Sequence, residues 1–112
     1  DYRRGVALYR AGDYYAAARA FERVDRDNVK LNAQYNLGNA LFQQGDFEGA
    51  ILAYQEVLAE DSDRRDARHN LGLAKAMLAE TDPEAARKSL EAMCEKLLAN
   101  TVIEDYAIEL EA

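Results

Sequence analysis

Apolar residues recur at helical spacing through the middle of the chain. Residues 31–44 carry one apolar stripe, and residues 47–59 carry a second. Gly45 and Asp46 interrupt the pattern between them, as a glycine does just past a helix end. Because a turn this short leaves two helices only an antiparallel way to pack, this stretch predicts a helix hairpin.

The hairpin pattern returns along the chain. The run Asn36-Leu37-Gly38 recurs 34 positions later as Asn70-Leu71-Gly72, and Gly5 precedes Gly38 by 33 positions. A period of this size predicts stacked helix pairs, each of which buries its apolar face against its neighbours. We therefore expect an all-α solenoid of three antiparallel helix hairpins over residues 1–80, with units at about 1–29, 30–62 and 63–80 onward.

The third unit diverges after its first helix. No Gly-Asp pair follows Leu78. Thr81 and Glu84 instead have the spacing of a capping box, and Pro83 suits a first helical turn. The pattern predicts a C-terminal helix over residues 81–99 that packs on the last repeat.

Residues 100–112 form a tail that allows two interpretations. Tyr106, Ile108 and Leu110 alternate with other positions, which is typical of a half-buried strand. Ile103 and Tyr106 also share one face of a helix. We favour an extended tail with a β-strand, which would need a partner edge, for example in a second copy of the chain.

Residues at fixed offsets within the units carry a family resemblance. In unit two they are Leu37, Gly38, Leu41, Gly45, Phe47, Ala50 and Tyr54. They match the pattern of the tetratricopeptide repeat, and residues 2–78 together resemble that family. Gln34 stands where the pattern has Trp, and the proline that ends a repeat is missing. The resemblance implies a protein-interaction scaffold that holds a peptide or helix in its concave groove.

Two narrower resemblances concern origin and the C-terminal part. The phrases YRAGDYYAAARAFERVD and AQYNLGNALFQQGDFEGAILAYQEVL are similar to repeats of bacterial aerotolerance-type proteins, which join such repeats to a von Willebrand factor type A domain and membrane segments. This implies a fragment of a bacterial membrane-associated or periplasmic protein. Residues 85–110 resemble the C-terminal segment of the small subunit of phosphoribosylformylglycinamidine synthase. The chain shows no resemblance to the rest of that subunit, so we expect no purine-synthesis activity. A fusion or an engineered chain would explain the mixture.

The family resemblance implies where a partner would bind. Asn36 and Asn70 hold the same place in successive first helices, and Asn39 lies one turn after Asn36. An amide offers donors and an acceptor, so it can hold the backbone of an extended peptide with little demand on its sequence. The alternative is that these asparagines serve packing between repeats. The residues expected to line the groove are Tyr2, Val6, Tyr9, Tyr35, Asn36, Asn39, Phe42, His69, Asn70, Leu73 and Met77.

Charge and composition exclude several functions. The net charge of −7 argues against nucleic acid, because phosphates need clustered Lys and Arg. No apolar run approaches the roughly 18 residues that cross a bilayer. His69 and Cys94 are the only histidine and cysteine and lie far apart in sequence, so we expect no enzyme activity, metal or cofactor. The expected partner is another protein or peptide, and the alternative is self-association.

Overall fold

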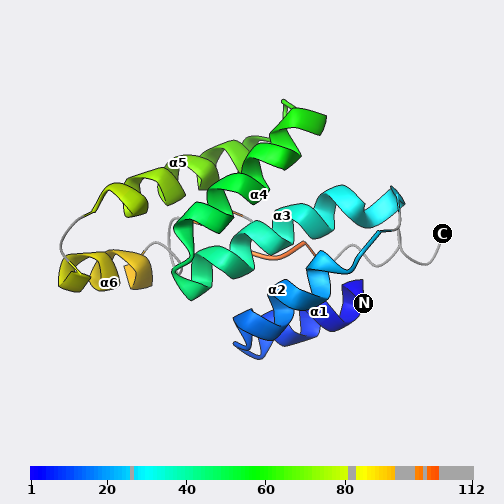
Figure 1. Cartoon of the computed structure of the whole chain (residues 1–112), viewed down its shortest axis with the longest axis horizontal. Coiled ribbons are helices and arrows are strands. Elements are labelled where there is room, and N and C mark those ends of the chain that lie inside the picture. Colours follow the sequence, from blue (N-terminus) through cyan, green and yellow to red (C-terminus); the bar gives the residue numbers. More distant parts are fainter. Residues whose placement is uncertain (26, 81–82, 93–97, 100, 104–112) are drawn as a thin grey trace.

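The computed structural model describes residues 1–25, 27–80, 83–92, 98–99 and 101–103, and these form an all-α helical repeat (Figure 1). Its helices are α1 (Tyr2–Arg10), α2 (Tyr14–Glu22), α3 (Asp27–Gln44), α4 (Phe47–Glu60), α5 (Arg65–Ala79) and α6 (Pro83–Ala92). From α1 to α5 each helix packs against the next, so the predicted stack of hairpins is present. The molecule measures 45 × 30 × 21 Å.

Two equivalent Gly-Asp turns close the first two hairpins. Gly12 and Gly45 have φ angles of 85° and 84°, a left-handed conformation that glycine adopts without a Cβ clash. The aspartate that follows each glycine then caps the next helix. The Oδ1 atoms of Asp13 and Asp46 accept the backbone N–H of the residue three positions further on, at 3.2 and 3.0 Å. The turn chemistry therefore ends one helix and starts its antiparallel partner.

A glycine on the first helix of each closed hairpin lies against an aromatic ring of the second helix. A Cβ on Gly5 would lie 2.5 Å from Phe21 Cε1, and a Cβ on Gly38 would lie 2.5 Å from Tyr54 Cε1. Both rings are buried, so neither can move aside freely. The close approach of the two helices at Gly38 is thus a contact between a bare helix backbone and a tyrosine ring.

The contact at Gly38 gives a testable expectation with a matched control. Gly38→Ala should lower the free energy of unfolding by about 1–3 kcal/mol, because the new methyl group overpacks a rigid core. Gly72→Ala should instead raise it by up to about 1 kcal/mol, since alanine is the better helix former. Within the part of the chain that the structure describes, a Cβ at that position meets no atom within 4 Å. Chemical denaturation measures both, and equal effects of the two substitutions would contradict the hairpin contact.

Unit three does not close as the first two units do. Glu80, the residue after α5, has an extended backbone with φ −72° and ψ 124°, whereas the first helix of each of the other hairpins is followed by a left-handed glycine. Lys88 occupies the position equivalent to Tyr54 and is exposed, so no ring among the described residues covers Gly72. As a result α6 touches α5 only lightly and lies near its C-terminal end (Figure 1).

The C-terminal helix does not reach the residue that the sequence predicts. Within the described residues α6 spans Pro83–Ala92, and Leu98 and Ala99 are not helical, so the prediction that this helix continues to residue 99 is wrong. The reason is tertiary: the Leu98 side chain is buried against the repeats, and the backbone of Ala99 is hydrogen-bonded to them. The strand predicted in the tail falls mostly on residues 104–112, outside the described residues.

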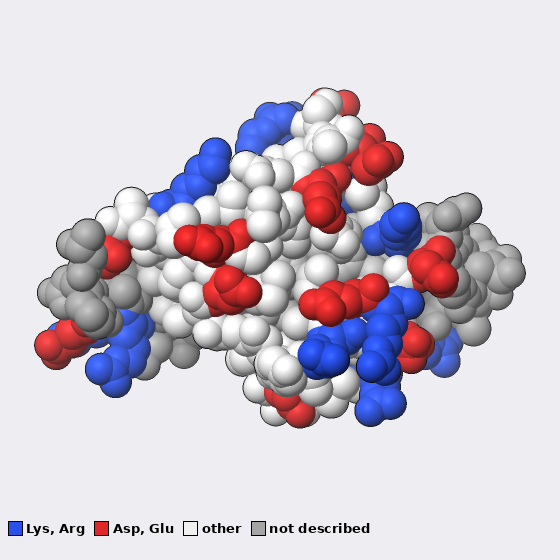
Figure 2. All heavy atoms as spheres, in the orientation of Figure 1, with Lys and Arg blue, Asp and Glu red and all other residues white. Residues whose placement is uncertain are grey.

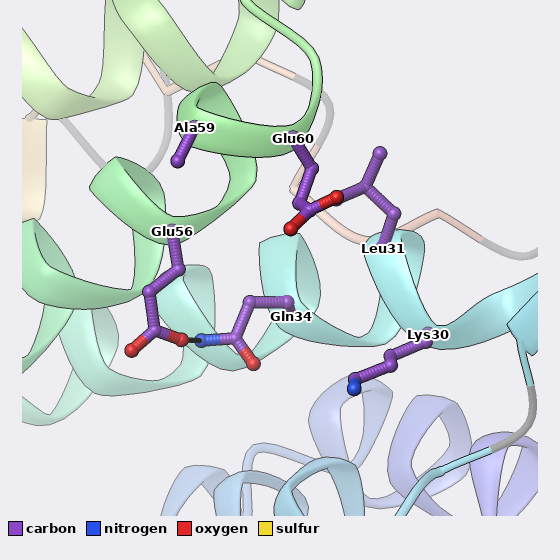
Figure 3. Close-up of a pocket in the computed structure, with 6 residues that line it drawn as sticks. All are labelled: Lys30, Leu31, Gln34, Glu56, Ala59 and Glu60. Atoms are coloured by element: carbon purple, nitrogen blue, oxygen red, sulfur yellow. Dashed lines mark hydrogen bonds between the residues drawn. The ribbon is translucent and has the colours of Figure 1, made fainter.

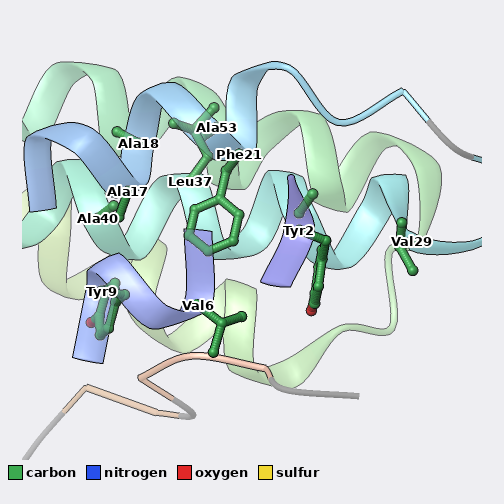
Figure 4. Close-up of a cluster of buried hydrophobic side chains, with 11 residues drawn as sticks. Tyr2, Val6, Tyr9, Ala17, Ala18, Phe21, Val29, Leu37, Ala40 and Ala53 are labelled. Carbon is green, nitrogen blue, oxygen red and sulfur yellow. The ribbon is translucent and has the colours of Figure 1, made fainter. Parts of the chain in front are cut away.

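The buried side chains form two clusters, one at each junction of the stack. The first cluster joins α1, α2 and α3 and takes in Ala53 from α4, and Figure 4 shows its members converging from these helices. The second cluster joins α3, α4 and α5, and it also takes in Leu98 from the C-terminal segment. Helix α3 contributes to both clusters and is the central element of the fold.

Candidate functional site

Residues 98–99 and 101–103 cross the face that the first helices of the three units form, and we call them the segment. Figure 4 shows this non-helical segment, in orange, passing beside α1 with Tyr2 and Val6 pointing toward it. Side chains from α1, α3 and α5 hydrogen-bond to its backbone. These side chains are Tyr2, Tyr35, Asn36, Asn39 and Asn70, and we call them the clamp face.

Two asparagines hold the segment through paired hydrogen bonds. Asn36 Oδ1 accepts the N–H of Ile103 at 2.8 Å, and Asn36 Nδ2 donates to the carbonyl of the same residue at 3.0 Å. Asn70 treats Ala99 in the same way, with both distances 2.9 Å. Both amides are fully buried, so these bonds meet the polar requirement of groups that have no access to water.

A tyrosine from the preceding unit completes each asparagine clamp. The Tyr2 hydroxyl donates to the Ile103 carbonyl, and the Tyr35 hydroxyl donates to the Ala99 carbonyl. Tyr2 and Tyr35 hold equivalent positions, 33 residues apart. The same tyrosine–asparagine clamp therefore occurs at both junctions between units, and the two clamps hold residues that are four positions apart in the segment.

The bonding pattern shows that the segment presents alternate residues to the clamp face. Asn39 Nδ2 donates to the carbonyl of Thr101 at 2.9 Å, midway between the two clamped residues. Residues 99, 101 and 103 thus turn their backbone polar groups the same way, which is the period of an extended strand. Here side-chain amides take the place of a neighbouring strand.

Tyr54, whose ring lies against Gly38 in unit two, also supports the clamp face. Tyr54 donates its hydroxyl hydrogen to Asn39 Oδ1, which orients the amide toward Thr101. Unit one has Phe21 at the equivalent position, and Val6 stands where unit two has Asn39. Unit two therefore pairs a tyrosine hydroxyl with an amide that accepts its hydrogen bond. Unit one instead pairs a phenylalanine ring with an apolar valine.

Burial disfavours the ionised form of the tyrosine in the second clamp. It raises the pKa of the Tyr35 hydroxyl well above its ordinary value, against a smaller opposing effect of the hydrogen bond to Asn39. The hydroxyl, which is protonated at neutral pH in any case, therefore keeps the proton that it donates to Ala99 to a higher pH than an exposed tyrosine would. Arg64 lies over the Tyr35 ring at 5.2 Å and pairs with Asp66 at 3.2 Å, so neighbouring opposite charges compensate each other.

The other predicted groove residues differ in their surroundings. Val6 and Tyr9 are buried in the first cluster, Phe42 and Met77 are buried in the second, and Leu73 packs on the second from a half-buried position. His69 is exposed, although it holds the position equivalent to Tyr2 and Tyr35.

The sequence analysis did not predict that the segment would bind to this face. The signal for it in the sequence is that residues 97–103 are uncharged and lie between charged residues.

The family comparison bears directly on these repeats. A family model described as tetratricopeptide repeat matches residues 2–65, which is more than half of the chain. The chain belongs to the tetratricopeptide repeat family. Tetratricopeptide repeats generally mediate interactions between proteins, and the closed hairpins of α1 to α4 lie within the matched residues.

A second family model matches the C-terminal part of this tetratricopeptide repeat protein. The model is described as phosphoribosylformylglycinamidine (FGAM) synthase, and it matches residues 72–112. The match covers little more than a third of the chain, and the described residues within it contain α6 and no strand. No curated protein and no solved structure matches the chain significantly. The likeness to aerotolerance-type proteins stays a prediction.

Two hollows lie away from the clamp face. One, of about 650 Å³, lies between α3 and α4, where Figure 3 shows Gln34 donating to Glu56 at 2.5 Å with Lys30 and Glu60 nearby. The other, of about 230 Å³, lies beside α1 and α2, where Figure 2 shows a gathering of basic side chains; its lining includes Arg4, Arg19 and Arg23.

The described part of the chain holds neither a metal cluster nor a membrane span. Within the described residues, no three His, Cys, Asp or Glu side chains come together as metal ligands. No helix among these residues has the length and apolar character to cross a membrane.

Proposed function

We propose that this tetratricopeptide repeat protein binds an extended peptide segment on its clamp face, and that it recognises the segment chiefly through its backbone. The observation that supports this proposal is the repeated tyrosine–asparagine clamp, which holds Ala99 and Ile103 in the same way at two successive junctions. A backbone-directed clamp makes little demand on the side chains of the residues it holds. We propose binding, and no catalysis, as the activity of this face.

The surroundings of the amides favour binding over a role in repeat packing alone. Asn70 Nδ2 does lie 2.8 Å from the Tyr35 hydroxyl oxygen and 3.2 Å from Asn39 Oδ1, so it also links two units. The Oδ1 atoms of Asn36 and Asn70, however, accept from the backbone of the segment. Packing between repeats would not require acceptors aimed at a non-helical chain.

The test uses a peptide supplied in trans to the full chain. The probe is the labelled hexapeptide Leu-Ala-Asn-Thr-Val-Ile, blocked at both ends, and the background is Ala99→Pro. Proline removes the N–H that donates to Asn70 and lies outside the helices, so it should weaken docking of the chain's own segment. In this background Asn36→Ala with Asn70→Ala should weaken peptide binding about tenfold or more, measured by fluorescence anisotropy.

Two controls make the binding test specific. Asn32 lies one turn before Asn36 on α3 and accepts from Arg64, so Asn32→Ala should leave the affinity within about twofold. A peptide that ends in acidic residues should not bind, because the clamp face contains no Arg or Lys. Equal binding by the asparagine variant and its parent would refute the proposed function.

A further inference from the structure

We propose that residues 98–99 and 101–103 are an intramolecular ligand: they keep the clamp face occupied and compete with an external partner, an extended uncharged peptide with apolar residues at the positions of Leu98, Val102 and Ile103. The proposal rests on the proposed function and specifies its ligand class and its regulation.

Three apolar side chains of the segment contact the repeat cores. Leu98 is only 8% exposed and belongs to the second cluster. Val102 packs against the first cluster, and Ile103 packs against the second. Since the clamps bind backbone atoms that every residue except proline has, these three contacts are the ones that distinguish one peptide from another. They require a large apolar residue, followed four and five positions later by two β-branched ones.

The clamps also define the direction and the register of the bound chain. Ala99 lies at the junction of units two and three, and Ile103 lies at the junction of units one and two. A bound peptide therefore runs from unit three toward unit one. Because the clamps hold residues four positions apart, a peptide must stay extended over at least five residues to engage both.

The charges around the clamp face favour an uncharged ligand. The side chains that bond to the segment are tyrosines and asparagines, and the three amides are fully buried. The nearby charges, Arg64 and Asp66, already pair with each other. A charged side chain at the position of Leu98 would enter an apolar cluster without a partner, which is costly.

Attachment to the same chain makes the segment a strong competitor. A tethered segment acts at an effective concentration in the millimolar range, so even a weak intrinsic affinity keeps the site filled. The apparent affinity for an external peptide is then the intrinsic affinity multiplied by the fraction of molecules whose clamp face is free. A partner must displace the segment before it can bind.

The experiment compares the wild-type full chain with two variants that weaken docking of the segment. Ala99→Pro removes a backbone donor, and Leu98→Asp places a charge in the second cluster. Each should bind the labelled hexapeptide about tenfold or more tightly than the wild type, because its clamp face is free more often. Thr101→Ala is the matched control: this side chain is exposed and only its carbonyl is bonded, so the affinity should match the wild type.

The outcomes separate this proposal from the proposed function. If wild type and both variants bind the peptide equally, the segment is no competitor and the intramolecular proposal is overturned, while peptide binding stands. If none of the chains binds, the proposed function fails as well. Circular dichroism verifies that each variant keeps its helices, since residues 98 and 99 belong to none of them.

A second measurement distinguishes the chain's own segment from that of another copy. Hydrogen-exchange protection of Ala99 and Ile103 should be independent of protein concentration if each chain fills its own clamp face. Light scattering should then report the mass of a monomer. Protection that rises with concentration together with a dimer mass would assign the segment to a second copy and overturn the intramolecular proposal.

Discussion

Replacing Asn36 and Asn70 together by alanine should accelerate amide hydrogen exchange at Ala99 and Ile103 by about tenfold to a hundredfold each. Both N–H groups donate to the Oδ1 atoms that the substitutions remove. A buried donor left without a partner costs about 1–3 kcal/mol, and each 1.4 kcal/mol corresponds to a factor of ten in the opening equilibrium. Exchange followed by NMR measures the two amides individually. The same variant should also unfold at a lower temperature, because both amides are fully buried.

Asn32→Ala provides the matched control for this prediction. Asn32 lies on α3 like Asn36, is only half-buried, and accepts a hydrogen bond from Arg64 at 3.3 Å. Its removal should leave exchange at both amides unchanged. Unchanged exchange in the double asparagine variant itself would show that the clamps do not hold the segment in solution.

Tyr54→Ala should destabilise the fold more than any of the other single substitutions, by about 3–5 kcal/mol. The ring is fully buried in the second cluster, covers Gly38 and carries the hydroxyl that orients Asn39. Its loss opens a cavity at the centre of unit two. With a shift of about 4–8 °C per kcal/mol for a domain of this size, the melting temperature should fall by at least about 12 °C. Calorimetry or thermal circular dichroism gives the value.

Two further tyrosine variants show which part of Tyr54 matters. Tyr15 is 64% exposed, so Tyr15→Ala should change stability by no more than about 0.5 kcal/mol. Tyr54→Phe keeps the ring and removes the bond to Asn39, which should cost about 1 kcal/mol. A Tyr54→Ala chain as stable as the Tyr15→Ala chain would mean that the hairpin core is assembled differently.

Local rules were enough to predict the two closed hairpins. Gly12 and Gly45 stand where a helix must end in the left-handed region, and each is followed by an aspartate that caps the next helix. Since both effects act within a few residues, the sequence reveals them without any tertiary information. The predicted tetratricopeptide repeat family and the predicted all-α fold are also confirmed. Both predictions depend on features that recur within one repeat unit.

The helix predicted to reach residue 99 shows where such rules fail. Leu98 fits an apolar helical stripe after α6, but it is buried in a cluster built by α3, α4 and α5. Helical spacing identifies an apolar residue that needs burial, yet it cannot say against which element that burial occurs. For Ala99, the backbone N–H and carbonyl bond to the Asn70 amide of α5 instead of to other groups of a continued helix.

For the candidate site, the asparagines were found from the repeat, while their ligand was not. Asn36 and Asn70 stand out because they recur at one position of successive units. The hydroxyls of Tyr2 and Tyr35 were predicted to line the groove, but their role as the second half of each clamp appears only in the folded chain. Each clamp brings residues of two repeat units into contact with residues near the C-terminus. Spacing along the sequence does not predict such a contact.

The sequence by itself determined the repeat, its hairpin turns and the placement of amides on one face, because these follow from periodicity and from turn and capping chemistry within about one unit. Only the tertiary structure decided that Leu98, Ala99, Thr101 and Ile103 fill that face. The physical reason is that buried amides must find partners, and which chain supplies them depends on what folding brings within reach.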